Sequence, residues 1–261
     1  MALEMAAPVR PYIQRRRAEL RADTRARLLA ATRELIPASE TSLPVTAIAR
    51  HAGVAVQTIY DQFGSKGGLL IALIADEQAT SGLMDSFRHV FQSEHGEEAM
   101  RRMIAATVSF WHRAWVIVEF LLRVRRTDPV VRREMEFIDR LRNAHYWAIT
   151  KRLEQEGRIR GGRSADSAAD QAFALTIANV YEELAVVRGA MLADAIATIT
   201  EAVLGVILEP GTVPVLDPPP DWGALEEAAA DRAKRAGSDP ARLTVDWRST
   251  AGGRDRPSQS G

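Results

Sequence analysis

The sequence predicts an all-α protein, and three observations carry this prediction. From about residue 22 to residue 208, apolar side chains recur every three to four positions, which is the period of an amphipathic helix. Alanine is abundant over this span, and alternating β-branched runs bounded by turn residues are missing from the sequence there. The length of 261 residues, with 46% hydrophobic and 26% charged residues, suits one large or two modest cores.

The first helices are short and have clear stop signals. Residues 26–36 show one apolar face, and Pro37 marks the end of this helix because proline cannot continue it. A second short helix is predicted at about residues 44–52, where Pro44 suits the first turn since its missing N–H would have no partner there.

Longer helices are predicted beyond residue 64. Glycine and proline in the segments SEHGEE, TDP and GRIRGG mark the breaks between them. We place these helices at about residues 66–80, 83–92, 97–115, 117–126, 130–156, 164–188 and 191–208.

The composition changes after residue 208. Residues 209–261 are rich in proline and glycine and bury too little apolar surface to offset the entropy of ordering, so we expect a largely disordered tail. One stretch inside it, residues 221–236, is compatible with a short helix capped by Asp221 and ended by Gly237.

The sequence offers little for catalysis or metal binding. It contains no cysteine, which excludes disulfides and thiolate zinc sites. It has neither a glycine-rich phosphate loop nor a His-Glu metal-binding helix, and its five histidines are dispersed. We therefore expect no enzyme activity, no metal and no cofactor.

Charge is distributed unevenly although the formal net charge is zero. Residues 1–70 carry ten Arg and Lys against six Asp and Glu, which favours an anionic partner, with a solvated basic face as the alternative. No apolar run approaches the roughly 18 residues of a membrane span, and no apolar segment follows the basic N-terminal stretch. We expect a cytoplasmic protein without a membrane partner.

The segment HAGVAVQTIYDQFGSK, residues 51–66, predicts a helix-turn-helix. Ile48 and Ala49 lie on the buried face of the helix before it, and Gly53 can take the positive φ that ends that helix. A second short helix then starts near Val56. This arrangement places the polar residues of the second helix on the outside of the corner.

These outer side chains match what DNA recognition needs. The Gln57 amide can pair with adenine and the Thr58 methyl can touch thymine in the major groove, while Tyr60 offers a hydroxyl to a phosphate. Ser65 and Lys66 place backbone N–H groups and a cation at the start of the next helix, where anions bind. The residues that we expect to contact DNA in this region are Thr46, Val56, Gln57, Thr58, Tyr60, Gln62 and Lys66.

Residues 1–21 are predicted to form a flexible basic arm. Arg15, Arg16 and Arg17 precede the first helix, and arginines on such an arm can enter a narrow minor groove or neutralise phosphates. A solvated leader without contact to DNA is the alternative.

The segments LLAATRELI and VTAIARHAGVAVQTIYDQFGSKGGLL resemble the DNA-binding region of the tetracycline-repressor (TetR) family. The most specific matching residues are Ile48-Ala49, Ala52-Gly53-Val54, Thr58-Ile59-Tyr60, Phe63 and Ser65-Lys66. The resemblance implies an all-α homodimer with an N-terminal three-helix, helix-turn-helix DNA-binding domain. It also implies a C-terminal helical domain that binds a small ligand and dimerises through its last two long helices. We place these domains at residues 22–66 and 67–208.

Four features depart from the family's pattern. Ala55 stands where Ser or Thr usually caps the recognition helix, and losing such a cap costs about 1 kcal/mol. Gln57 replaces a commonly small residue, and Asp61 brings a negative charge near phosphates. Gly67 and Gly68 replace better helix formers, and we expect them to loosen this joint.

The resemblance implies a sequence-specific transcriptional regulator. We expect a homodimeric repressor that binds a double-stranded DNA operator and is released by a ligand. The departures above leave a second interpretation open, a dimeric small-molecule-binding or scaffolding protein with weak or lost operator binding.

Aromatic and methionine side chains concentrate between residues 87 and 181. A cavity among helices is the usual small-molecule site, although most such side chains simply fill a core. The predicted pocket residues are Phe87, Met103, Trp111, Trp115, His112, Asn143, Trp147 and Tyr181. An apolar pocket of this kind suits a hydrophobic or aromatic small-molecule effector.

The last two predicted helices are rich in alanine, which permits close helix contact. Apolar residues in the second of them follow a 3,4,3 spacing that makes a narrow seam. Under the resemblance, these helices form the dimer interface, for which we predict Ala172, Ala178, Ile196, Ile199, Val203 and Val206. A helix pair inside one chain's core is the alternative.

Overall fold

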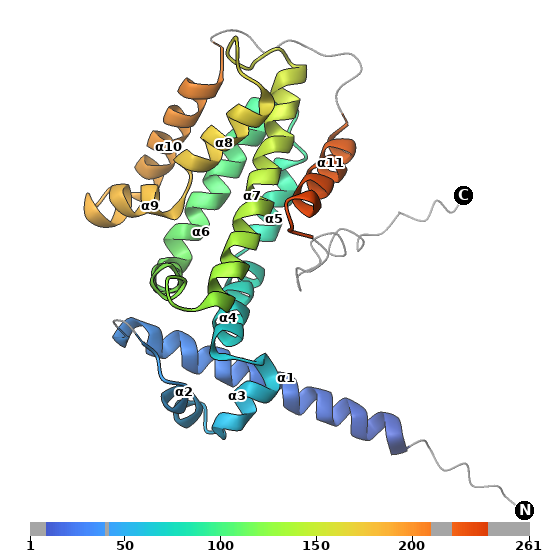
Figure 1. Ribbon diagram of the computed structural model, residues 1–261, viewed down its shortest axis with the longest axis vertical. Helices are drawn as coiled ribbons and strands as arrows, with labels where there is room; N and C mark the ends of the chain where they lie inside the picture. The colour runs from blue at the N-terminus through green and yellow to red at the C-terminus, as the bar shows by residue number, and fades with distance from the viewer. Residues whose placement is uncertain (1–8, 40–41, 210–220, 240–261) are drawn as a thin grey trace, which may run out of the picture. The chain divides into compact units, whose positions relative to one another are not determined.

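The computed structural model describes residues 9–39, 42–209 and 221–239, and within them the chain is helical with no β-strand (Figure 1). An isolated antiparallel bridge joins Ile159 to Leu208. The all-α prediction is therefore confirmed.

The chain divides into two compact units. The head unit comprises the described parts of residues 1–74 and 119–131, and the body unit those of residues 75–118 and 132–261. Three helices contribute residues to both units: α4 (Lys66–Thr80), α6 (Gly96–Val124) and α7 (Pro129–Gln155).

The other elements belong to one unit each. The head unit holds α1 (Val9–Leu35), a 3₁₀ turn η1 (Ile36–Ala38), α2 (Val45–His51) and α3 (Val56–Phe63). The body unit holds α5 (Leu83–Val90), α8 (Ala165–Leu175), α9 (Ala178–Tyr181), a π-helical turn η2 (Glu182–Val187), α10 (Leu192–Ile207) and α11 (Trp222–Arg235).

Helix α1 begins earlier than the sequence predicted. Helical structure starts at Val9, although the prediction placed the first helix at residues 26–36 and a flexible arm before it. Good helix formers dominate the added turns, and Arg15 pairs with Glu19 one turn later at 3.0 Å. The described side chains of these turns are mostly exposed, so no apolar face marks them in the sequence. Residues 1–8 lie outside the described part.

Helix α6 is a single helix, which corrects the prediction of two helices at residues 97–115 and 117–126. No glycine or proline follows Gly96 within it, so nothing interrupts the hydrogen-bond ladder. It is the one described helix that is long and apolar enough to cross a membrane by length and composition, and half of its apolar stretch is buried inside the protein. Core helices of water-soluble proteins have the same properties.

The helix predicted at residues 164–188 is broken into α8, α9 and η2. At the break, the Thr176 hydroxyl donates to the carbonyl oxygens of Ala172 at 2.8 Å and Phe173 at 3.1 Å. Ile177 then adopts an extended conformation with ψ at 155°. A threonine side chain that bonds to backbone groups in this way competes with the helical ladder, which accounts for the interruption.

The body core forms where α5, α6, α7, α8 and α10 meet. Its fully buried side chains include Met103, Ile104 and Val108 of α6, with Tyr146 and Ile149 of α7. This packing positions the cavity described below.

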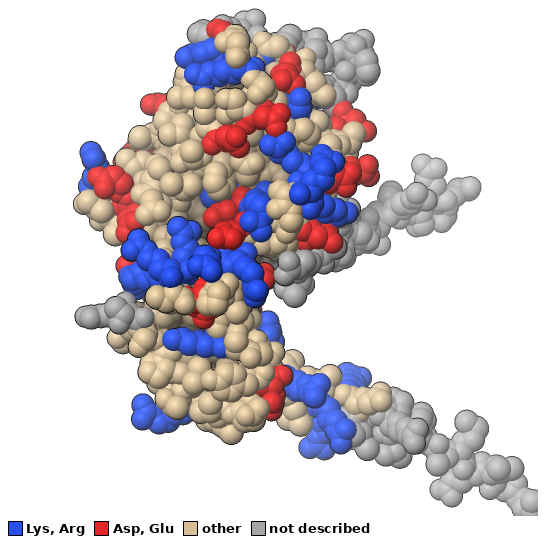
Figure 2. Space-filling model, viewed as in Figure 1, with Lys and Arg blue, Asp and Glu red and all other residues tan. Residues whose placement is uncertain are grey.

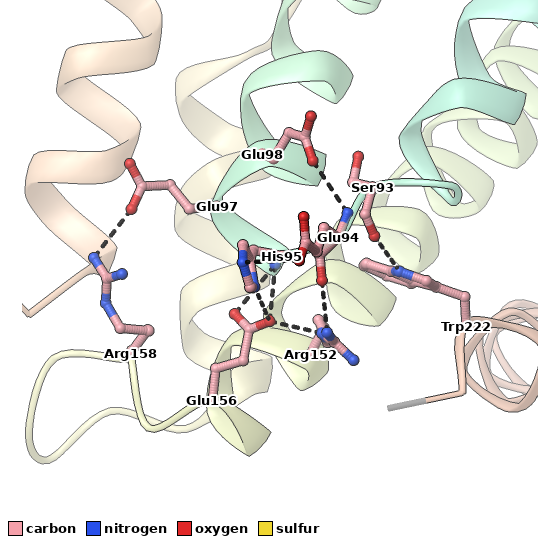
Figure 3. Close-up of polar contacts among 10 residues, drawn as sticks. Ser93, Glu94, His95, Glu97, Glu98, Arg152, Glu156, Arg158 and Trp222 are labelled. Atoms are coloured by element: carbon pink, nitrogen blue, oxygen red, sulfur yellow. Dashed lines mark hydrogen bonds and ion pairs between the residues drawn. The ribbon is translucent and has the colours of Figure 1, made fainter. Parts of the chain in front are cut away.

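A buried ion pair closes one end of this core. The Glu156 carboxylate, 1% exposed, pairs with Arg152 at 2.7 Å and accepts the Gly96 N–H at 3.1 Å (Figure 3). A carboxylate at the N-terminus of α6 is stabilised by the helix dipole and by the unpaired N–H groups there. Nearby, burial acts to raise the pKa of Glu97, but the Arg101 and Arg158 guanidinium groups outweigh it and lower that pKa.

Helix α11 is folded and packed, although it lies in the tail that was expected to be largely disordered. Its Asp221 cap accepts the Gly223 N–H at 2.8 Å. Leu225, Ala229 and Ala233 are buried against apolar residues of α7. These small apolar side chains gain a partner surface that the sequence pattern does not reveal. Residues 210–220 and 240–261 lie outside the described part, so the expectation of disorder there stays a prediction.

The α11 helix is also anchored by its first residue. The Trp222 indole N–H donates to the Ser93 carbonyl oxygen at 2.8 Å (Figure 3). The same ring meets Phe91 edge-on at 5.7 Å and lies under the Arg152 guanidinium at 5.7 Å. Trp222 therefore ties α11 to the turn between α5 and α6.

Candidate functional site

The corner between α2 and α3 has the geometry of a helix-turn-helix. Ile48 and Ile59 are 0% exposed and Ala49 is 2% exposed, so the two helices share a dry contact. Gly53 has φ of 65°, which allows the turn that the sequence predicted at this position. Ala55 occupies the N-cap of α3 without a side-chain hydrogen bond, as the sequence also indicated.

The outer face of α3 presents Gln57, Tyr60 and Asp61 to solvent. Tyr60 is 42% exposed, so its ring and hydroxyl are open to a partner. The Gln57 side-chain amide donates to Asp61 at 2.9 Å. This bond orients the amide and leaves one N–H and the carbonyl oxygen of Gln57 for a base edge.

The other predicted DNA contacts around α3 are less open. Thr58, Gln62 and Val56 are half-buried, whereas Thr46 at the start of α2 is exposed. Gln62 donates to the Arg21 carbonyl oxygen at 3.3 Å, so part of its amide is already used within the head. Val56 shares the inward stripe of α3 with Ile59, which disfavours it as a base contact.

The start of α4 is built to receive an anion. Ser65 accepts the Gly68 N–H at 2.9 Å and so caps this helix, while Gly64, with φ of 71°, ends α3 directly before it. Lys66 is the first residue of α4 and half-buried. The helix dipole, the first N–H groups and the lysine charge act together at one point.

Gly67 and Gly68 are positions of close packing, which corrects the expectation that they loosen the joint. A Cβ at Gly68 would lie 2.1 Å from the Phe63 carbonyl oxygen. A Cβ at Gly67 would lie 2.8 Å from the Asp128 carboxylate and 2.9 Å from Val130. Only glycine permits this approach of α4 to α3 and to the start of α7.

The predicted basic residues Arg15, Arg16 and Arg17 lie on the exposed turns of α1. Figure 2 shows basic side chains along this helix with acidic ones among them. The Arg15–Glu19 pair is largely exposed, so it contributes little stability and does not prevent Arg15 from contacting a phosphate.

Two further arginines of α1 support the corner, and sequence reasoning missed both. The Arg25 guanidinium lies 4.9 Å from the centre of the Phe63 ring. Arg27 donates to the Ala52 carbonyl oxygen at 3.4 Å, at the C-terminus of α2, where a cation is favoured. No sequence spacing predicts such contacts between distant segments.

The body unit contains a largely apolar cavity of about 530 Å³. Two predicted residues, Phe87 and Trp111, line it. The lining residues that the prediction of pocket residues missed are Gln78, Leu83, Met84, Arg88, Phe91, Gln92, Thr107, Phe110, Ile138, Leu141, Arg142, His145, Gly223, Glu226 and Glu227. Its size and aromatic walls suit a small organic ligand.

Helix α11 supplies part of the wall of this cavity, through Gly223, Glu226 and Glu227. His145 of α7 lies in another part of the cavity wall. The centre of its ring is 5.9 Å from the centre of the Phe87 ring and 5.7 Å from that of Phe91, and both contacts are edge-on. Burial lowers the pKa of His145 to about 4, so this side chain is neutral at physiological pH.

The remaining predicted pocket residues lie elsewhere in the body unit. Met103 is fully buried in the core, and His112 bonds to the Tyr181 hydroxyl at 2.9 Å with Trp115 beside that ring. Trp147 is covered by Arg232 of α11 at 5.4 Å. These residues fill space between helices, as the alternative interpretation held.

Asn143 lines a separate, open hollow of about 700 Å³ and donates to Asp170 at 3.1 Å. The hollow is lined by charged groups of both signs, including Asp139 and Arg140 of α7 and Arg232 of α11. Its mixed charge makes it unlike the apolar cavity.

Several predicted dimer-interface residues are buried within the single chain. Ala172 and Val203 are 0% exposed and Ile199 is 2% exposed, so these side chains pack in the body core and cannot reach a partner. Ala178 is 7% exposed, and Ile196 and Val206 are half-buried. The 3,4,3 seam therefore follows the intramolecular alternative, because α10 packs on α8 along it.

A different apolar surface is exposed near the start of α10. Val186, Val187 and Met191 are 50%, 67% and 73% exposed. Exposed apolar side chains that lie close together mark an interaction surface more often than isolated ones do.

Comparison with known proteins identifies relatives of the head unit. Residues 28–73 match the family described as bacterial regulatory proteins, tetR family. No curated protein matches the chain.

Solved structures of transcriptional regulators share the fold. One is FadR from Bacillus subtilis in complex with stearoyl-CoA, with 19% identity and a TM-score of 0.59 over 70% of this chain and 98% of that chain. Another is SmeT in complex with triclosan, with 21% identity and a TM-score of 0.56 over 76% and 98%. A third is the TetR-family regulator PfmR from Thermus thermophilus, with 19% identity and a TM-score of 0.53 over 67% and 96%.

Proposed function

Residues 28–73 belong to the tetR family of bacterial regulatory proteins, and from this premise we propose that the protein is a homodimeric, sequence-specific repressor released from its operator by a small apolar or aromatic ligand. The observation that carries the proposal is the helix-turn-helix corner. Its buried Ile48 and Ile59 pack α3 against α2, while Gln57 and Tyr60 face solvent. A regulator of this kind is not an enzyme and acts on DNA in the cytoplasm.

In this proposal α3 enters the major groove. Gln57 reads a base edge, with its amide oriented by Asp61, and Thr58 and Tyr60 contact the flanking methyl group or phosphate. Lys66 and the capped N-terminus of α4 bind one phosphate. Arg15, Arg16 and Arg17 add phosphate contacts from α1.

The proposed dimer uses the exposed apolar surface around Met191 in place of the buried seam. Val186 and Val187 flank it, and the small exposed side chains Ala197 and Ala202 continue along α10. A two-fold dimer of this kind would present two α3 helices to an operator with matching symmetry.

Helix α4 is the element that we propose to couple ligand and DNA. Within the head, Gly67 at its start packs against Asp128, which caps α7 by accepting the Val130 N–H at 2.9 Å. Gln78, near its other end, lines the cavity in the body unit. In this proposal the ligand binds one position of α4 more tightly than another, and this difference in affinity is what couples the ligand to DNA. The favoured position of α4 sets the spacing between the DNA-binding heads of the two subunits.

The test is a fluorescence-anisotropy titration of the full chain with its neighbouring intergenic DNA at several salt concentrations. We expect tight binding that weakens as salt rises, and weaker binding for Lys66→Ala and Tyr60→Phe. Lys151→Ala is the matched control, since Lys151 lies in the body unit and pairs with Glu154. Binding no tighter than to unrelated DNA would favour the alternative.

That alternative is a dimeric small-molecule-binding or scaffolding protein. The uncapped Ala55 and the carboxylate of Asp61 on the outer face of α3 are the features that favour it, since they weaken the helix and repel phosphates. Size measurement of the protein in the same samples separates a folded dimer without DNA affinity from a protein that has lost its structure.

A further inference from the structure

His145 is a neutral polar side chain in the wall of the apolar cavity. It extends from α7 and is half-buried, and its ring contacts Phe87 and Phe91, which line the same cavity. Among the described residues, no group forms a hydrogen bond with either of its ring nitrogens. A neutral imidazole has one N–H donor and one nitrogen acceptor, so both remain open to a ligand.

The ring nitrogens of His145 are accessible from the cavity. In the described part of the chain, the buried side-chain nitrogens and oxygens without a hydrogen-bond partner belong to Thr107, Arg142, Tyr146, Trp147 and Arg158. The His145 nitrogens also lack a partner but are not among these buried atoms, so they retain accessible surface. Because burial lowers the pKa of His145 to about 4, this surface faces the cavity and not bulk solvent.

The charged groups of the wall do not favour an ionic ligand. The lining contains two basic and two acidic side chains, whose formal charges cancel: Arg88, Arg142, Glu226 and Glu227. Each arginine has an aspartate partner on its own helix, Asp85 at 3.0 Å and Asp139 at 3.2 Å. Glu227 is exposed, so solvent screens its charge. An ion loses its hydration in an apolar cavity, and this wall has no net charge to offset that cost.

The other uncharged polar side chains of the wall are less suited to bind a ligand. The Thr107 hydroxyl oxygen is a buried atom, and Gln92 is exposed to solvent. Gln78 is half-buried on α4, and its long side chain loses rotamer entropy when it binds. The ring of His145 is already held by two aromatic contacts, so ordering it costs less.

The apolar part of the wall is mainly aromatic. Its aromatic side chains are Phe87, Phe91, Phe110 and Trp111. Aromatic rings attract one another in edge-to-face and offset arrangements beyond the effect of apolar burial. A ligand with an aromatic body therefore suits this wall better than an alkyl chain does.

We propose that the cavity binds a neutral phenol, with its hydroxyl group hydrogen-bonded to the His145 ring and its aromatic body against the aromatic side chains of the wall. The volume of about 530 Å³ accommodates a ligand of this class. His145 then determines which aromatic compounds bind. The inference rests on the proposed function only in treating this cavity as the effector site.

The test compares four compounds with the same naphthalene body, by equilibrium dialysis against the full-length protein at pH 7.5. They are 2-naphthol, 2-methylnaphthalene, 2-naphthoate and 2-naphthylmethylammonium. We expect 2-naphthol to bind at least as tightly as 2-methylnaphthalene, although the methyl group is the more hydrophobic one. The two charged compounds should bind more weakly than 2-naphthol.

Variants of His145 assign the preference to its ring nitrogens. His145→Phe keeps an aromatic ring and removes the nitrogens, so it should weaken 2-naphthol relative to 2-methylnaphthalene about tenfold, which corresponds to about 1.4 kcal/mol. His145→Gln, which keeps a donor and an acceptor, should lose less. His89→Phe is the matched control and should change nothing, since His89 is exposed on α5 and does not line the cavity.

The wild-type comparison decides the question even if His145→Phe does not fold. The proposal is overturned if 2-naphthol binds more weakly than 2-methylnaphthalene or fails to bind below about 1 mM. It is also overturned if either charged compound binds more tightly than 2-naphthol, or if folded His145→Phe keeps the wild-type ratio. Operator binding, measured separately on the same protein, shows whether the proposed function fails independently of this inference.

Discussion

Replacing Trp222 with alanine should detach α11 from the body unit. The change removes a half-buried indole that meets Phe91 at 5.7 Å, and it removes the hydrogen bond to the Ser93 carbonyl oxygen at 2.8 Å. A fully buried aromatic residue replaced by alanine costs about 3–5 kcal/mol, so partial burial suggests about 2 kcal/mol, and the hydrogen bond adds about 1 kcal/mol. A total of about 3 kcal/mol raises the detached population roughly a hundredfold.

Hydrogen–deuterium exchange measures this population directly. In Trp222→Ala, amides of α11 should exchange about a hundredfold faster, while those of α3 in the head unit should not change. Trp222→Phe is the matched control, because it keeps the ring contact and loses only the N–H, so its effect should be about fivefold. Unchanged protection of α11 in Trp222→Ala would refute this account of how the helix is anchored.

Three further predictions concern the stability of the two units. Gly68→Ala should lower the melting temperature more than Gly67→Ala, because the added Cβ would lie 2.1 Å from the Phe63 backbone carbonyl oxygen, whereas at Gly67 it would lie 2.8 Å from the Asp128 carboxylate and 2.9 Å from Val130. Equal melting temperatures would contradict this. Ile59→Ala should lower the unfolding free energy of the head unit, measured by urea titration, by about 2–5 kcal/mol and abolish DNA binding, since Ile59 is fully buried. An unchanged unfolding free energy would show that the α2–α3 corner does not depend on this contact. Burial lowers the pKa of His145 to about 4 from an ordinary value near 6.5. As pH falls, His145 is therefore protonated in the unfolded chain before it is protonated in the folded protein, and the folded protein loses stability between about pH 6.5 and pH 4. His145→Phe should therefore remove about 2 kcal/mol of the difference in unfolding free energy between pH 7 and pH 5, and an unchanged difference would assign the acid sensitivity to other groups.

Local patterns predicted the head corner well because its determinants lie close together in the sequence. The buried face of α2, the positive φ of Gly53 and the uncapped start of α3 at Ala55 all follow from residues within one or two turns. The close approach at Gly68 did not follow, because it depends on where the Phe63 carbonyl lies in space.

The cavity was harder to predict, since its walls come from five helices. Aromatic content alone singled out Phe87 and Trp111, which line the cavity, but it could not separate them from core residues such as Met103. Arg142 escaped notice because a charged residue on a long helix usually faces solvent. Its burial depends on Phe173 and Thr176, which come from a different part of the chain.

The seam on α10 shows the limit of periodicity. A 3,4,3 spacing identifies one apolar face, and both a partner chain and a neighbouring helix can cover such a face. Ala172 of α8 and Ile199 of α10 are buried together in one chain, so the spacing reports the core of the body unit.

A nuclease-protection footprint on the intergenic DNA tests the central claim most directly. The account predicts one protected segment that contains two inverted half-sites about one helical turn apart, and Tyr60→Phe together with Lys66→Ala should weaken the protection. Uniform, weak protection along the fragment, unchanged by these substitutions, would contradict sequence-specific binding through α3.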